Sequence, residues 1–123
     1  MTLTIPGDTP AKKNSKQIIY VRGKPLIIPS KAHKAWHDAS MKHVKGYPPC
    51  FYPKCGVFAT FYSKTAREAD LDNKVSSILD LLVDAGILSS DGWNTVAMQG
   101  SMYGGKDKDN PRCEVEIHEI NQQ

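Results

Sequence analysis

The sequence predicts one small domain of the α/β (α+β) class, covering residues 1–123, in which a mixed β-sheet packs against two main helices. Three observations lead to this fold class. Short apolar runs of strand-like composition recur along the chain, two longer segments repeat apolar residues at helical spacing, and Gly, Pro and Asn separate these segments. With 123 residues, the chain can bury a core without disulfides.

Several short segments have the composition of β-strands. Two of them, "QIIYV" and "PLIIP", flank "RGK" and predict a β-hairpin in which Gly23 supplies the turn. The last segment, "CEVEIHEI", alternates apolar residues with glutamates, as expected of a strand with one wet face. Before it, Gly104 and Gly105 predict a hairpin-like turn. The expected strands are residues 3–5, 17–21, 25–29, 56–64, 93–103 and 113–120.

Two helices are predicted between these strands. The first has Ser30 as its N-cap, runs to about Lys45 and stops at Gly46. The second follows Asp70 and ends at Gly86, a natural C-terminal stop. The apolar residues that recur at helical spacing in the second helix are Leu71, Val75, Ile78, Leu79 and Leu82.

The composition predicts a cytoplasmic protein without a membrane partner. The longest dense apolar block, residues 78–83, contains Asp80, so no stretch approaches the roughly 20 apolar residues of a membrane-spanning helix. The N-terminus has neither a basic start nor an apolar run, so no secretory signal is predicted. Three cysteines, an odd number, argue against a disulfide framework and predict buried free thiols.

The net charge of +3 hides a strong asymmetry along the chain. Residues 12–45 hold nine Lys and Arg against one acid, whereas residues 68–91 hold six acids against one lysine. A basic half indicates an anionic partner, with nucleic acid first among the options. The acidic cluster would repel such a partner unless metal ions neutralise it.

The acids gather around the second predicted helix. Asp70 and Asp72 lie two residues apart, so their side chains point the same way if the chain enters the helix in an extended conformation. Asp80 is two turns further along, and Asp91 lies in an "SSDG" turn that can fold back towards the first pair. Mg²⁺ prefers such oxygen ligands and leaves positions for a substrate phosphate. Such a site suits phosphodiester hydrolysis by a metal-activated water.

The same acids also fit a structural role. An Asp directly before a helix often serves as its N-cap, and an acid in the first turn interacts favourably with the helix dipole. D-x-D is in addition a short and common pattern. On spacing alone, both interpretations stay open.

The segments "ADLDN", then Asp80 in the apolar helix, then "AGILSSD" ending at Asp91, resemble the RusA family of Holliday junction resolvases of bacteria and their prophages. "PAKKNSK" and "CEVEIHEI" also resemble the family, so the similarity covers nearly the whole chain. The resemblance implies a mixed α/β homodimer that binds four-way DNA junctions. Such a protein makes paired symmetric nicks with Mg²⁺ or Mn²⁺ in DNA recombination and repair. The metal-binding, catalytic aspartates of the family fall on Asp70, Asp72 and Asp91.

The basic loop "KKNSK" offers cations together with amide and hydroxyl donors, which is what positioning on a phosphate backbone requires. The family often carries a lysine four residues after the second aspartate, where this chain has Ser76, and paired acids where Ser90 precedes Asp91. Lys74 is near Ser76 but lies about 200° around the helix from it. The predicted DNA-binding residues are Lys12, Lys13, Asn14, Ser15, Lys16 and Lys74.

Other functions stay open at this point. A nuclease with the same site could act on other branched or flapped nucleic acids. A non-catalytic DNA-binding protein would use the aspartates as helix caps and would bind DNA without a divalent metal. A prophage relic that has lost activity is a further alternative, for which Ser76 is the motivating feature.

Overall fold

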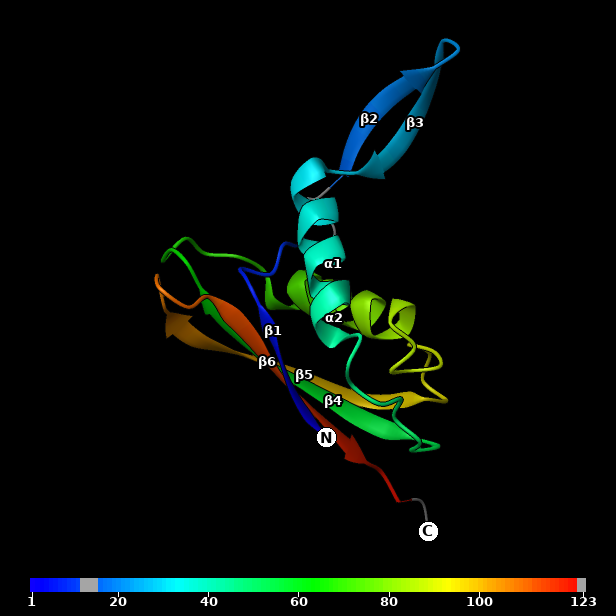
Figure 1. Cartoon of the computed structure of the whole chain (residues 1–123), viewed down its shortest axis with the longest axis vertical. Helices are drawn as coiled ribbons and strands as arrows, with labels where there is room; N and C mark the ends of the chain where they lie inside the picture. Colours follow the sequence, from blue (N-terminus) through cyan, green and yellow to red (C-terminus); the bar gives the residue numbers. More distant parts are fainter. Residues whose placement is uncertain (12–15, 122–123) are drawn as a thin grey trace.

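A computed structural model describes residues 1–11 and 16–121, apart from the side chains of Lys16 and Pro29. Two helices and six strands are described (Figure 1). In chain order they are β1 (Thr2–Pro6), β2 (Lys16–Val21), β3 (Lys24–Pro29), α1 (Lys31–Val44), β4 (Cys55–Ser63), α2 (Leu71–Asp84), β5 (Val96–Lys106) and β6 (Arg112–Glu119).

Four of the strands form one mixed sheet in the order β1-β6-β4-β5. The β1–β6 and β4–β6 pairs are antiparallel, whereas β4 and β5 are parallel. Two parallel neighbours require a crossover connection, and α2 supplies it. The prediction of a small α+β domain with a mixed sheet and two helices is confirmed.

Both helices lie on one side of the sheet (Figure 1). The buried apolar residues of the helices and of the sheet form the core between these two layers. The predicted alternation of the last strand is confirmed, because Cys113, Val115 and Ile117 are fully buried while the glutamates between them face the other side. From α2, Ile78 and Leu82 are likewise fully buried. These buried side chains pack α2 against the sheet.

The predicted helix ends are also confirmed. Ser30 is the N-cap of α1, and its Oγ accepts a hydrogen bond from the backbone N–H of His33 at 3.2 Å. Beyond α2, Gly86 has a φ of +74°, the left-handed conformation that ends many helices.

The β2–β3 hairpin forms a separate two-stranded sheet that projects from the body at the far end of α1 (Figure 1). Its turn has positive φ at both central residues, 54° at Arg22 and 79° at Gly23. Two positive φ values in a two-residue loop match the twist of the flanking strands, and they confirm the turn predicted at Gly23.

The turn predicted at Gly104 and Gly105 is wrong, because both residues belong to β5. A Cβ at Gly104 would lie 2.6 Å from the ring of Tyr62, so glycine is needed there to let an aromatic ring cross the strand. The pairing of β4 with β5 shifts register at this point, between Phe61 and Tyr62. Close packing, and not chain reversal, explains the glycine.

Among the described helices, none is long and apolar enough to cross a membrane. The three cysteines are free, as predicted; Cys55 and Cys113 are buried, and Cys50 is half-buried.

We expect only one of the three thiols to react quickly with a thiol reagent such as DTNB in the native protein. Burial raises the pKa of the Cys113 thiol to about 12, and it also raises the pKa of Cys55, so both stay protonated near neutral pH. The half-buried Cys50 should react first, and the others only after unfolding. Mass spectrometry of the partially labelled protein checks this order; fast native labelling of Cys113 would contradict the buried position of β6.

Candidate acidic site at the start of α2

The crossover from β4 to β5 decides where the candidate residues lie. The chain leaves β4 at Ser63, enters α2 after Asp70 and returns to the beginning of β5. Asp70 and Asp72 therefore lie on the side where the two parallel strands end, since Ser63 pairs with Lys106 there. In open α/β sheets, the carboxyl ends of parallel strands are where ligands usually bind.

Asp70 occupies the N-cap position of α2, with φ −77° and ψ 124°, but its side chain makes no capping hydrogen bond. Its Oδ2 instead accepts a hydrogen bond from Nδ2 of Asn73 at 3.3 Å. Asp72 follows in the first helical turn, and both aspartates are exposed. A structural cap alone therefore does not account for the carboxylate of Asp70, and both carboxylates face solvent in the favourable field of the helix N-terminus.

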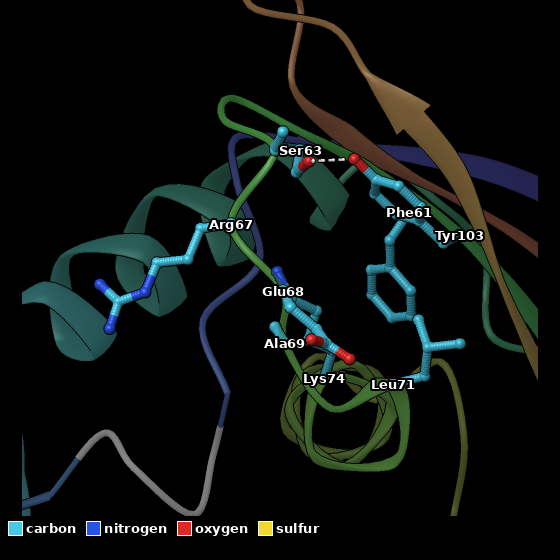
Figure 2. A pocket seen from close by; sticks show the side chains of 9 residues that line it. Phe61, Ser63, Arg67, Glu68, Ala69, Leu71, Lys74 and Tyr103 are labelled. Carbon is cyan, nitrogen blue, oxygen red and sulfur yellow. Dashed lines mark hydrogen bonds between the residues drawn. The ribbon is translucent and has the colours of Figure 1, made fainter.

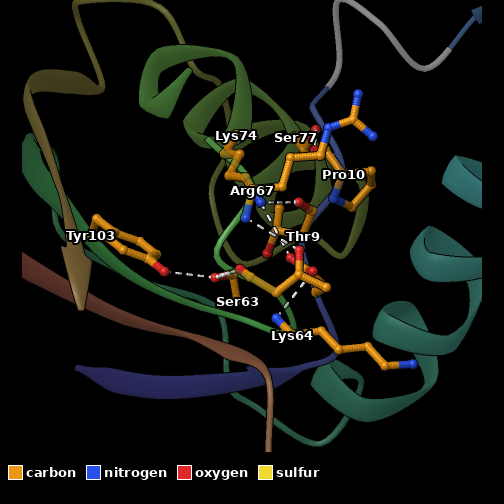
Figure 3. A network of polar contacts seen from close by, with 10 residues as sticks. Thr9, Pro10, Ser63, Lys64, Arg67, Lys74, Ser77 and Tyr103 are labelled. Atoms are coloured by element: carbon orange, nitrogen blue, oxygen red, sulfur yellow. Dashed lines mark hydrogen bonds and ion pairs between the residues drawn. The ribbon is translucent and has the colours of Figure 1, made fainter. Parts of the chain in front are cut away.

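The segment before the basic loop is fastened to the same end of α2 (Figure 3). Lys74 Nζ donates to the carbonyl of Thr9 at 2.7 Å and lies 3.2 Å from Oδ1 of Asp8. One turn later, Ser77 Oγ donates to the carbonyl of Pro10 at 2.7 Å. Residues 8–10 are thus held beside Asp70, in a groove that Thr9, Pro10 and Asp70 line together.

The predicted DNA-binding residues divide into two groups. Lys12, Lys13, Asn14 and Ser15 lie outside the described residues, as does the side chain of Lys16, whose backbone begins β2. Lys74 is described, and its side chain is only 12% exposed because it braces the N-terminal segment. We therefore find a structural contact for Lys74, and its role in DNA binding stays a prediction.

Replacing Lys74 with alanine should lower the free energy of unfolding by about 1 kcal/mol, because one hydrogen bond and one partly exposed ion pair are lost. Urea unfolding measures this change, with Lys108→Ala as an exposed control. If Lys74→Ala is as stable as the control variant but binds DNA more weakly, Lys74 contacts DNA instead.

Asp91 lies far from the acidic pair within one chain. The loop that contains it leads into β5 at Val96, which pairs with Cys55 at the beginning of β4. In addition, the backbone N–H of Cys55 donates to the carbonyl of Thr95 at 2.8 Å. A helix of 14 residues such as α2 is about 21 Å long, and it separates Asp70 from this loop.

The expectation that the Asp91 turn folds back towards the first pair is therefore wrong for a single chain. The physical reason is the crossover, because a helix that joins two parallel strands returns the chain to the opposite end of the sheet. Within residues 1–11 and 16–121, no group of three His, Cys, Asp or Glu residues is close enough to hold a metal ion. Asp80 lies on α2 between the two ends and is half-buried.

Sequence reasoning missed a pocket that Ala69 and Leu71, the two neighbours of Asp70 in the chain, help to line (Figure 2). Its volume is about 340 Å³, and one wall is the loop that leads from β4 into Asp70. Tyr103 from β5 and Ser63 from β4 form the opposite side and are hydrogen-bonded to each other at 2.9 Å. The only sequence signal was the polar segment "SKTARE" between a strand and the aspartates.

No protein-family model matches this chain, and no curated protein matches it either. What the fold and the site define is a small α+β protein with two exposed carboxylates at the carboxyl ends of a parallel strand pair. The resemblance to RusA resolvases therefore rests on the sequence segments quoted above.

Proposed function

We propose that this protein is a Mg²⁺-dependent endodeoxyribonuclease that cuts four-way DNA junctions by paired symmetric nicks. It would act as a cytoplasmic homodimer in DNA recombination and repair. One observation carries the proposal: exposed Asp70 lies beside residues 8–10, which are held against α2 and lead into a strongly basic sequence segment, and exposed Asp72 follows in the first turn of the same helix. In the sequence, cations that can bind phosphate thus follow directly after residues that are held next to a carboxylate that can bind metal.

The donor set at this end fits Mg²⁺, which is commonly bound by one or two carboxylates together with substrate phosphate and water. Asp70 and Asp72 would hold the ion, and Mn²⁺ suits the same oxygens. When bound, the ion lowers the pKa of a water and stabilises the leaving oxygen. The hydrogen bond from Asn73 holds Asp70 at the helix entrance, and the hydrogen bond from Ser77 to the carbonyl of Pro10 holds the residues before the basic segment against the same helix.

A second copy would supply the third aspartate. Asp91 lies beyond the opposite end of α2 from Asp70 and Asp72, so two chains related by a two-fold axis with antiparallel α2 helices would bring Asp91 of each copy towards the pair of the other. A four-way junction has approximate two-fold symmetry, and two nicks need two sites related by the same operator. The dimer and the paired cuts thus follow from one arrangement.

The free edge of β5 is the surface that we propose for this dimer. β5 is an edge strand of 11 residues, and Met98 and Met102 on it are each more than half exposed. Long unprotected edges readily pair with another strand. Antiparallel pairing of two β5 strands would join the Val96 end of one copy to the Lys106 end of the other, which is the direction that the shared site requires.

The test is cleavage of a labelled synthetic four-way junction and a matched linear duplex, with and without Mg²⁺, with the nicks mapped on each strand. We expect paired symmetric nicks at the junction, no cuts in the duplex, and no activity without metal. Cuts in flaps or forks but not in four-way junctions would favour a nuclease for other branched DNA. Tight binding without cleavage under any divalent metal would leave a non-catalytic DNA-binding protein or an inactive relic.

A further inference from the structure

The pocket beside Asp70 lies among three elements of the fold (Figure 2). Phe61 of β4 and Leu71 of α2 form its apolar floor, and Tyr103 of β5 closes one side. Glu68 belongs to the loop on the other side and precedes Asp70 by two residues. A molecule in this pocket would therefore lie within about one nucleotide of a phosphate held at Asp70.

The exposed ring of Tyr103 gives the pocket a surface on which a flat ring can stack. The side chain of Phe61 is buried, with 2% exposure, and Lys74 Nζ lies 5.9 Å from the centroid of its ring, so Phe61 supports the pocket from below and does not itself stack on a ligand. Tyr103 is 51% exposed and presents an aromatic ring at the pocket wall. Stacking on aromatic side chains is the usual way in which proteins hold an unpaired base, and it contributes about 1–3 kcal/mol per base.

Arg67 and Lys74 bring positive charge to the lining of the pocket, and its other polar groups supply acceptors. Ser63 Oγ donates its single proton to the carbonyl of Thr65 at 2.6 Å, so at 2.9 Å it must accept the proton of the Tyr103 hydroxyl. The Tyr103 oxygen, with its proton committed, can then only accept hydrogen bonds from a ligand. Glu68 adds a carboxylate, which is a second acceptor.

We infer that this pocket binds a single unstacked nucleobase, preferably one with an exocyclic amino group, from the strand that is cut. The inference rests on the proposed function and adds a basis for choosing branched DNA over duplex. A base in a continuous duplex must be unstacked and unpaired before it can enter the pocket, at a cost of a few kcal/mol. A base at the crossover of a junction is already partly free, so the pocket favours junctions.

The inference is tested with junctions that carry 2-aminopurine, a fluorescent base with an exocyclic amine, at successive positions next to the crossover. Fluorescence is measured without divalent metal, so that the DNA stays uncut. We expect the wild-type protein to change the fluorescence at one position only. The variant Ala69→Trp should fill the pocket, remove this change and reduce the preference for junction over duplex about tenfold. Ala35→Trp, on the exposed face of α1, is the matched control and should behave as wild type.

A second variant tests the acceptor chemistry. Tyr103→Phe keeps the ring and removes the hydroxyl, so it should reduce the difference in affinity between a junction with adenine and one with unsubstituted purine at that position, and Glu68→Gln combined with it should reduce the difference further. If the wild-type protein cuts junctions but never changes the fluorescence, the proposal of a base-binding pocket is wrong, whereas the proposed nuclease activity is supported. A signal that persists in Ala69→Trp would also overturn the pocket. Failure to bind any DNA would overturn both proposals.

Discussion

Changing Asp72 to Asn is expected to reduce metal-dependent cleavage of a four-way junction at least about 100-fold, because a charged metal ligand is replaced by a neutral amide. The fold should survive. Asp72 is exposed in the first turn of α2, where a negative charge contributes only about 0.3–1 kcal/mol to helix stability. Nicking rates and thermal unfolding, measured on the same preparation, separate the two effects.

The matched control is Asp38→Asn, which removes an exposed carboxylate from α1. It should cut as wild type does. If Asp72→Asn also retained wild-type cleavage, the aspartates would serve only the helix, and the acidic pair would not be a metal site.

The second large effect concerns the edge of β5. Ser101 is the central residue of this strand, so in a symmetric antiparallel pair it faces its own copy across the two-fold axis. Ser101→Lys would place two like charges opposite each other, which is destabilising in a sheet. We expect the dimer to dissociate at least about tenfold more readily and cleavage to fall in parallel at low protein concentration.

Sedimentation velocity and cleavage, measured over the same concentration series, check this prediction. Cleavage by Ser101→Lys should recover at high protein concentration, and Ser101→Thr should keep the dimer because a β-branched residue suits a strand. A monomeric wild-type protein, or a Ser101→Lys variant that cuts normally at every concentration, would contradict pairing through β5.

Most local structure could be predicted from the sequence because its causes are local. The cap at Ser30, the positive φ at Gly23 and the alternation along β6 each depend on a few neighbouring residues. The order of strands has no such local signal. The parallel pairing of β4 with β5, and with it the role of α2 as a crossover, became evident only in the structure.

In the candidate site too, the features with local causes could be predicted and those that depend on the order of strands could not. Asp70 and Asp72 are neighbours in sequence, so their common position at the start of α2 could be predicted. The position of Asp91 depends on the crossover and could not. Lys74 has the charge of a DNA contact, but the Asp8–Pro10 segment folds over it, which the sequence does not indicate. The pocket could not be predicted either, because Tyr103 and Ser63, which line it together, are 40 residues apart in the chain.

The claim that two chains share each acidic site is tested most directly by mixing inactive chains. Asp72→Asn and Asp91→Asn proteins are each assayed alone and after joint refolding into mixed dimers. In a shared arrangement, one site of the mixed dimer carries both substitutions, and the other carries neither. We predict that each protein alone is inactive and that the mixture regains metal-dependent nicking of one strand per junction. A mixture as inactive as its components, with mixed dimers demonstrated by mass spectrometry, would contradict the shared site.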